Sequence, residues 1–319
     1  MKNTAKALLA LTTLFIATNT HALIVFGKSN EEAQVDYSKA NAAQASVVFA
    51  SNGSAVYLGN GWFLTANHVS VALDSQIQQN GNFATVDKID NTLNNTFGAD
   101  LKLFHVGDTS ALSDLQSVKL STDIYSKMSD STWDGDTLIR GSELLLVGAG
   151  YGRSANSALD DTTVPSDGKR GTIHFGTATT INKATYEIWD GNEQQFDTND
   201  YPMIEIVAEA REGATSALTG DSGSGMFFEY EGDFYLVGTT VWVDSDASAN
   251  TITFGQIESN MEYRTKYSHT YGVNLKDFLY EIGEITGINV PEPSTYAAIL
   301  GLLTLGIAFK KTRCRNTCK

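Results

Sequence analysis

A serine, a histidine and an aspartate in three separate stretches of the chain could together perform nucleophilic catalysis. Ser222 lies in the run Gly-Asp-Ser-Gly, directly before an apolar, strand-like segment, and its small neighbours would leave the hydroxyl accessible. A serine hydroxyl is a poor nucleophile at neutral pH, so it needs a base within hydrogen-bond distance and a group that orients this base. The resulting chemistry would be acyl transfer.

His68 is the candidate base among the five histidines of the chain. It lies two positions after the apolar run 62–66, so a strand would anchor its backbone while the imidazole faces a cleft. Asp100 precedes the apolar run 101–106, which would hold its carboxylate near the core. Such a carboxylate can fix the imidazole tautomer and stabilise the imidazolium. Taken singly, the three residues could also be a turn serine, a loop histidine and a capping aspartate.

The segments that would position these residues are mostly strands. Short apolar, β-branched and aromatic runs recur between clusters of Gly, Asn, Asp and Ser, which indicates an antiparallel barrel or sandwich. The strands do not alternate with helices, as they would in a parallel sheet. The runs lie at residues 46–51, 55–58, 62–66, 101–106, 143–147, 172–175, 204–208, 226–230, 234–243 and 251–257.

One segment and two polar stretches depart from this strand pattern. Apolar residues recur with helical spacing between Leu275 and Ile285, and Gly287 supplies a stop signal. We therefore expect an amphipathic helix at the end of the folded body. Residues 126–136 and 154–169 are polar and are expected to form surface loops.

The motifs resemble those of the chymotrypsin-like serine proteases, in the same order and over most of the body. WFLTANHV is similar to that family's Leu-Thr-Ala-Ala-His-Cys, ADLKLF to its Asp-Ile-Ala-Leu-Leu, and GDSGSGMF to its Gly-Asp-Ser-Gly-Gly-Pro. LLVGAGYGRS, LVGTTVWV and YGVNLKDFLYEI resemble framework segments. The resemblance implies an all-β double antiparallel barrel with a C-terminal helix. It also implies a secreted endopeptidase with the triad His68, Asp100 and Ser222, acting on proteins or peptides without a metal or cofactor.

The resemblance assigns roles to further residues. The backbone N–H groups of Gly220 and Ser222 would form an oxyanion hole. Ser216, Trp242 and Val243 would line the primary substrate pocket. Its uncharged base and β-branched wall predict elastase-like cleavage after small or medium aliphatic residues.

The N-terminal residues 1–22 predict a secretory signal peptide. Two lysines precede an apolar run that is too short to span a membrane, and small residues precede the expected cleavage site after Ala22. Signal peptidase would then leave Leu23 as the first residue. The resemblance implies that this terminal ammonium could insert beside Asp221 and activate the enzyme.

The C-terminal residues 289–319 resemble a PEP-CTERM sorting signal of exported Gram-negative bacterial proteins. A Pro-Glu-Pro motif at 291–293 precedes the apolar run 296–309 and a basic end. The basic end should remain cytoplasmic while the body is exported to the periplasm or cell surface. The resemblance implies transient membrane contact and removal of the tail by an exosortase-type enzyme; a simple tail anchor is the alternative.

The intervening body, residues 23–288, is the expected protease domain. It has 15 basic and 36 acidic residues, a net charge of −21, which argues against nucleic-acid binding. Acidic loops could bind calcium, but no EF-hand spacing is present. Both cysteines lie in the tail, at 314 and 318, so the body has no disulfide.

Four departures from the family pattern keep other functions open. Val69 and Leu218 replace cysteines, Ser224 replaces a glycine, and Val241 replaces a serine whose hydroxyl helps to hold the catalytic aspartate. The main alternative is a non-catalytic surface or matrix protein on the same fold, which only Val241 and the acidic loops support, because all three triad residues are present. An α/β-hydrolase esterase is disfavoured because the residues around the serine do not fit Gly-x-Ser-x-Gly.

Overall fold

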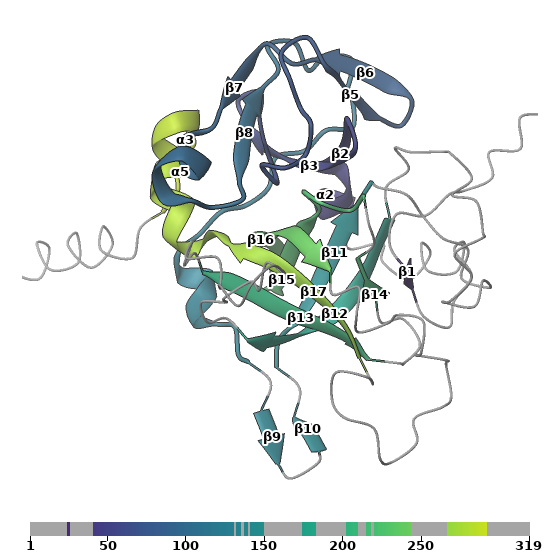
Figure 1. The fold of residues 1–319 in the computed structure, drawn as a ribbon, viewed down its shortest axis with the longest axis vertical. Coiled ribbons are helices and arrows are strands. Elements are labelled where there is room, and N and C mark those ends of the chain that lie inside the picture. The colour runs from purple at the N-terminus through teal and green to yellow at the C-terminus, as the bar shows by residue number, and fades with distance from the viewer. Residues whose placement is uncertain are drawn as a thin grey trace, which may run out of the picture.

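The chain is built mainly from antiparallel strands arranged in two β units. The computed structural model describes residues 24–25, 41–130, 132–134, 137–139, 141–149, 174–182, 202–209, 215–217, 220–243 and 267–291. Figure 1 shows the first unit above the second, with two short helices, α3 (Thr92–Phe97) and α5 (Leu279–Thr286), together at the left edge.

The first unit is a seven-stranded antiparallel sheet with the strand order β6-β5-β2-β3-β4-β8-β7. It follows a short helix, α2 (Asn41–Ala45), and α3 connects its last two strands. The edge strands β6 and β7 do not pair with each other, so the sheet stays open. Its strands are β2 (Val47–Ala50), β3 (Gly53–Gly59), β4 (Trp62–Thr65), β5 (Gln76–Gln79), β6 (Asn82–Thr85), β7 (Lys88–Asp90) and β8 (Lys102–His105).

The second unit is a closed six-stranded barrel with the order β11-β12-β13-β17-β16-β15, in which β15 pairs with β11 to complete the ring. Its strands are β11 (Glu143–Gly148), β12 (His174–Asn182), β13 (Met203–Glu209), β15 (Gly225–Tyr230), β16 (Asp233–Val243) and β17 (Tyr267–Asn274). Two small pairs lie outside the barrel: β9 (Thr132–Asp134) with β10 (Thr137–Ile139), and β1 (Ile24–Val25) with β14 (Thr215–Ser216).

The helical segment after the barrel consists of a 3₁₀ turn, η2 (Leu275–Phe278), and α5. The Asn274 side chain accepts a hydrogen bond from Lys276 N, which caps the first turn. Gly287 ends α5 in a left-handed conformation, with φ 67°, that favours glycine. Within the described ranges, the helices are too short or too polar to cross a membrane.

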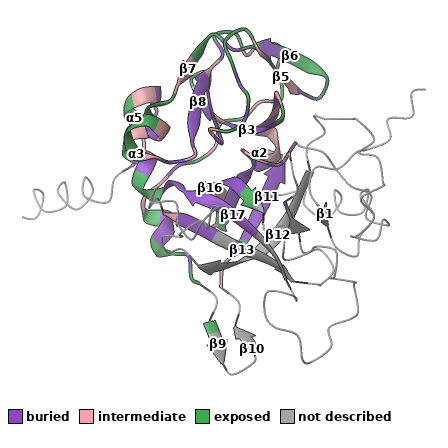
Figure 2. Ribbon diagram, in the orientation of Figure 1, coloured by how far each residue is buried: buried purple, intermediate pink, exposed green. Residues whose placement is uncertain are grey.

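Apolar side chains from both units form one continuous core. Figure 2 shows the buried residues following the strands through the sheet and the barrel. Phe63 and Phe104 stack in the sheet with ring centroids 5.2 Å apart, and Phe227 is fully buried in the barrel. Phe97 on α3 meets Phe278 of η2 edge to face, which connects the sheet to the helical segment. This packing fixes the two units relative to each other.

The structure confirms the expected all-β class, the two antiparallel units and the C-terminal helix. The first unit differs from a closed barrel because its edge strands β6 and β7 do not pair with each other. Residues 126–136, expected to be a loop, include β9 and the end of the 3₁₀ turn η1 (Asp123–Ser126). The strand expected at 251–257 and the loop at 154–169 lie outside the described residues.

Candidate active site

The pairing of β4 with β8 brings His68 and Asp100 together. The two strands are antiparallel with Thr65 opposite Lys102, so the end of β4 lies beside the start of β8. Asn67 N donates a hydrogen bond of 3.2 Å to the carbonyl oxygen of Asp100. The loop after β4 is therefore tied to the segment that precedes β8.

The Asp100 carboxylate makes two contacts with His68. Its Oδ1 accepts a hydrogen bond from the backbone N of His68 at 3.0 Å, and its Oδ2 lies 2.6 Å from His68 Nδ1. Because a carboxylate only accepts hydrogen bonds, this contact favours the tautomer in which Nδ1 donates and Nε2 accepts. The Asp100 side chain is 26% exposed, so the carboxylate is partly accessible to solvent rather than buried near the core as expected.

Ser222 completes the row of contacts from the other unit. Its Oγ lies 2.7 Å from His68 Nε2. The hydroxyl of Ser222 can donate to this nitrogen while Nδ1–H donates to Asp100, which is the proton arrangement that a serine nucleophile requires. The structure thus brings together all three residues that the sequence singled out.

The loop that carries Ser222 is held between the two units. The N–H of Ser54, on β3, donates to the carbonyl oxygen of Ser222 at 2.7 Å, and Gly223 N donates to Thr240 O at 2.7 Å. Gly223 has φ 86°, and a β-carbon there would collide with the carbonyl oxygen of Ser54. The small residues around Ser222 therefore permit a close approach to β3.

The proposed oxyanion-hole residues flank a buried carboxylate. Gly220 has φ 98°, a conformation that glycine adopts without strain. Among the described residues, neither Gly220 N nor Ser222 N has a hydrogen-bond acceptor. Asp221 between them is fully buried, and a β-carbon on Gly148 would lie 3.0 Å from its Oδ1.

The expected pocket residues lie on strands that border the same part of β17. Ala217 N, directly after Ser216, donates to Thr270 Oγ1 at 3.2 Å, and Thr270 pairs with Val243 at the end of β16. Trp242 is 39% exposed and stacks on Tyr271 with centroids 5.0 Å apart. Asp244 and Asp246, two carboxylates that follow the pocket residue Val243 in sequence, lie outside the described residues.

The first described residues lie beside the expected base of this pocket. Ile24 pairs with Ser216, and Val25 pairs with Thr215. Leu23, the expected first residue of the exported chain, lies outside the described residues. The strand pairing places its neighbour Ile24 opposite a residue six positions before Ser222.

Sequence reasoning missed two residues that support the site. Ser54 binds the Ser222 loop through its backbone, and its Oγ accepts a hydrogen bond from Ala149 N at 2.8 Å. No sequence signal marks this residue. Lys102 donates from Nζ to Val69 O at 2.8 Å. Its signal was available, because it is a charged residue within an apolar strand.

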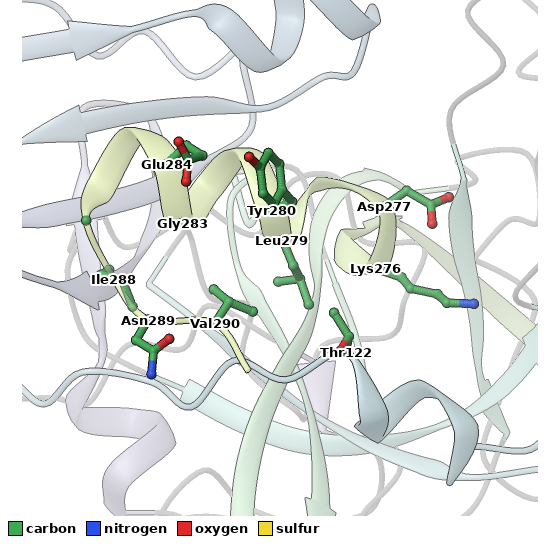
Figure 3. Close-up of a pocket in the computed structure, with 11 residues that line it drawn as sticks. Thr122, Lys276, Asp277, Leu279, Tyr280, Gly283, Glu284, Ile288, Asn289 and Val290 are labelled. Carbon is green, nitrogen blue, oxygen red and sulfur yellow. The ribbon is translucent and has the colours of Figure 1, made fainter. Parts of the chain in front are cut away.

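Another pocket, of about 540 Å³, lies away from these residues (Figure 3). It is formed by η2, α5, the chain after α5 and Thr122, and it contains no member of the candidate site. In the described part of the chain, no group of three or more His, Cys, Asp or Glu side chains could hold a metal ion.

An imidazole between a carboxylate and a serine hydroxyl, at the junction of two antiparallel β units, is the arrangement of a serine hydrolase. The family model named Trypsin matches residues 32–261, which is more than half of the chain. The chain therefore belongs to the trypsin family of serine proteases. None of the curated proteins compared with the chain matches it.

Proposed function

We propose that this protein is an exported serine endopeptidase in which Ser222 is the nucleophile, His68 the general base and Asp100 the residue that orients His68. The observation that supports this most strongly is the pair of contacts made by one imidazole. Its Nδ1 lies 2.6 Å from Asp100 Oδ2, and its Nε2 lies 2.7 Å from Ser222 Oγ.

In the proposed reaction, Ser222 Oγ attacks the carbonyl carbon of the scissile peptide bond as its proton moves to His68 Nε2. The N–H groups of Gly220 and Ser222 donate to the oxyanion that develops. His68 then gives its proton to the leaving amine, and the acyl group stays on Ser222. A water molecule, deprotonated by His68, releases this group in the second half of the reaction.

Hydrolysis of a protein substrate by the purified protein tests this proposal. A sulfonyl fluoride should abolish the hydrolysis by reacting with Ser222, and a metal chelator should leave it unchanged. Absence of hydrolysis across diverse protein substrates would favour the non-catalytic alternative. Val241 supports that alternative weakly, because a valine cannot provide the hydroxyl that helps to hold the aspartate in the family.

We also propose that signal-peptide removal creates an activating N-terminus. A fully buried carboxylate such as Asp221 requires a compensating charge or hydrogen bonds, and the ammonium of Leu23 would supply charge. The pairing of Ile24 with Ser216 places the N-terminal strand beside the segment leading to Ser222.

An extra residue before Leu23 should therefore lower kcat/KM, because it displaces the ammonium from Asp221. The expected loss is about 100-fold, since misplaced catalytic geometry carries costs of this size. Peptide hydrolysis by chains that begin at Leu23, or at an alanine added before it, gives the measurement. Equal activity of the two chains would contradict the insertion.

The substrate pocket is proposed to accept Ala, Val or Leu. Ser216 carries no charge to pair with a substrate lysine or arginine, and burying such a cation unpaired would be costly. A β-branched Val243 would narrow the pocket wall. The counter-hypothesis is that the carboxylate of Asp244 or Asp246 enters the pocket and pairs with a substrate lysine or arginine.

Replacing Val243 with glycine should raise kcat/KM for Phe and Tyr substrates by roughly 10-fold, as expected for altered fit in an apolar pocket. The measurement is the digestion of a peptide library by the wild-type and Val243→Gly proteins. Dominant wild-type cleavage after Lys or Arg would refute the aliphatic pocket.

Export and tail removal complete the proposed function. The last described residues pack against the body: Ile288 and Val290 contact the core, and Thr122 Oγ1 donates to Pro291 O at 3.0 Å. Processing is therefore proposed to occur beyond this anchored segment, near 291–293, by an exosortase-type enzyme that releases the body from transient membrane contact.

The native exported protein should therefore begin at Leu23 and end close to Glu292. Mass spectrometry of the intact protein from the producing cells measures both ends. A mature C-terminus at Lys319 would reject tail removal and support a tail-anchored enzyme instead.

A further inference from the structure

Lys102 is a buried lysine beside the proposed catalytic residues. It begins β8, two positions after Asp100, and is 9% exposed. Its Nζ donates a 2.8 Å hydrogen bond to the carbonyl oxygen of Val69, the residue that follows His68. The same oxygen accepts a hydrogen bond from Val71 N at 2.8 Å. The lysine therefore fixes the turn in which His68 lies.

Burial of this amine has an energetic cost. The side chain of Lys102 is buried, and an ammonium group withdrawn from water loses part of its hydration. Desolvation lowers the pKa of Lys102 below its ordinary value, and the negative charge of Asp100 opposes this effect. An apolar residue would fill the same position in the core without that cost, so packing alone does not account for the lysine.

Val69 links the lysine to the Ser222 loop. A β-carbon on Gly53 would lie 2.8 Å from Val69 Cγ2 and 2.6 Å from the carbonyl oxygen of Ser222. The Val69 side chain and the nucleophile loop therefore both pack closely against Gly53. The body contains no cysteine, so the turn is held by non-covalent contacts. This contact and the Lys102 hydrogen bond act there together with the hydrogen bonds that Asp100 accepts from Asn67 N and His68 N.

We propose that Lys102 is a positioning residue for the reaction: by holding Val69 O, it keeps the His68 imidazole in line with both Asp100 and Ser222. This role rests on the proposed function of the triad. The lysine contacts neither substrate nor the reacting atoms and acts only through the backbone of the turn. Loss of the amine should therefore lower kcat more than it changes KM.

A pair of chemically modified proteins isolates the amine from the packing of the side chain. In the chain that begins at Leu23 and carries Cys314→Ser and Cys318→Ser, the change Lys102→Cys introduces a single thiol. Alkylation in denaturant with 2-bromoethylamine, followed by refolding, restores a lysine-like amine. Alkylation with 1-bromopropane gives a side chain of the same length that ends in a methyl group.

The aminoethyl protein should recover most of the parent kcat. The kcat of the propyl protein should be lower than that of the parent by a factor of about 10 or more, and its KM should change little. Lys88→Cys, treated in the same way, is the control, because exposed Lys88 lies on neighbouring β7 and contacts the Trp62 ring rather than the turn. Thermal unfolding of each protein verifies refolding. Equal kcat values for the aminoethyl and propyl proteins, at equal stability, would overturn the role.

A measurement without substrate separates this role from the proposed function. The His68 Nδ1 proton, bonded to Asp100, should give a downfield proton resonance in both the parent and the aminoethyl protein. The propyl protein should lose or broaden it. If no protein hydrolyses peptides but the resonance follows the amine, positioning holds and the proposed function fails. A resonance unchanged in the propyl protein overturns positioning.

Discussion

Replacement of Ser222 by alanine should lower kcat by about 10⁶-fold, the loss that removal of the nucleophile causes in a serine hydrolase. Without Oγ, His68 Nε2 has no hydroxyl to deprotonate and no acyl intermediate can form. Substrate binding should persist, because the change removes one small atom from a half-buried loop. Peptide hydrolysis, normalised by active-site titration of the wild-type protein, measures the loss of kcat. A direct binding measurement with a peptide substrate measures the affinity that the variant keeps.

Ser224→Ala provides a matched comparison in the same loop. Its hydroxyl is buried and lies 3.3 Å from Ser54 Oγ rather than facing His68. This variant should keep most of the activity, and His68→Ala should resemble Ser222→Ala. Near-normal hydrolysis by Ser222→Ala would contradict the mechanism, since no other residue is assigned as nucleophile.

Asp100→Asn should lower kcat by about 10⁴-fold, as the equivalent change does in this type of triad. Asp100 Oδ1 accepts from His68 N, while Oδ2 contacts His68 Nδ1. An asparagine that keeps its carbonyl on His68 N must present its NH₂ group to Nδ1. Nδ1 then becomes an acceptor and Nε2 carries the proton, so His68 can no longer accept the proton of Ser222. Steady-state hydrolysis at neutral pH measures the effect.

A second His–Asp pair in the same sheet provides the control. His105 Nδ1 lies 2.7 Å from Asp87 Oδ1. Within the described part of the chain, neither side chain is hydrogen-bonded to Ser222. Asp87→Asn should change kcat by less than about twofold, because surface substitutions of this kind have small effects. Comparable losses in the two variants would indicate a general effect on the sheet rather than a specific role of Asp100.

The three candidate catalytic residues could be found from sequence because each lies at a strand boundary with strong local signals. Apolar runs place His68 after one strand and Asp100 before another, and small residues surround Ser222. Their meeting depends on the register of Thr65 with Lys102, which local periodicity does not specify. The family order of the motifs supplied that long-range information.

Other features depended on polar segments or backbone contacts. The hairpin of β5 and β6 is rich in glutamine, asparagine and threonine, so its apolar alternation is weak even though Asn80-Gly81 is a turn signal. Ser54 supports the loop of Ser222 through its N–H, which every residue other than proline possesses. The role of Lys102 depends on the path of its side chain to Val69, which sequence spacing does not reveal.

Labelling with a fluorophosphonate probe tests the central claim most directly. The probe reacts only with a serine whose hydroxyl is activated, so it reports on the Ser222–His68–Asp100 arrangement without knowledge of the substrate. Mass spectrometry of the labelled protein should place the adduct on Ser222, and His68→Ala should suppress labelling. A folded wild-type protein that remains unlabelled, or one labelled at another serine, would contradict the account.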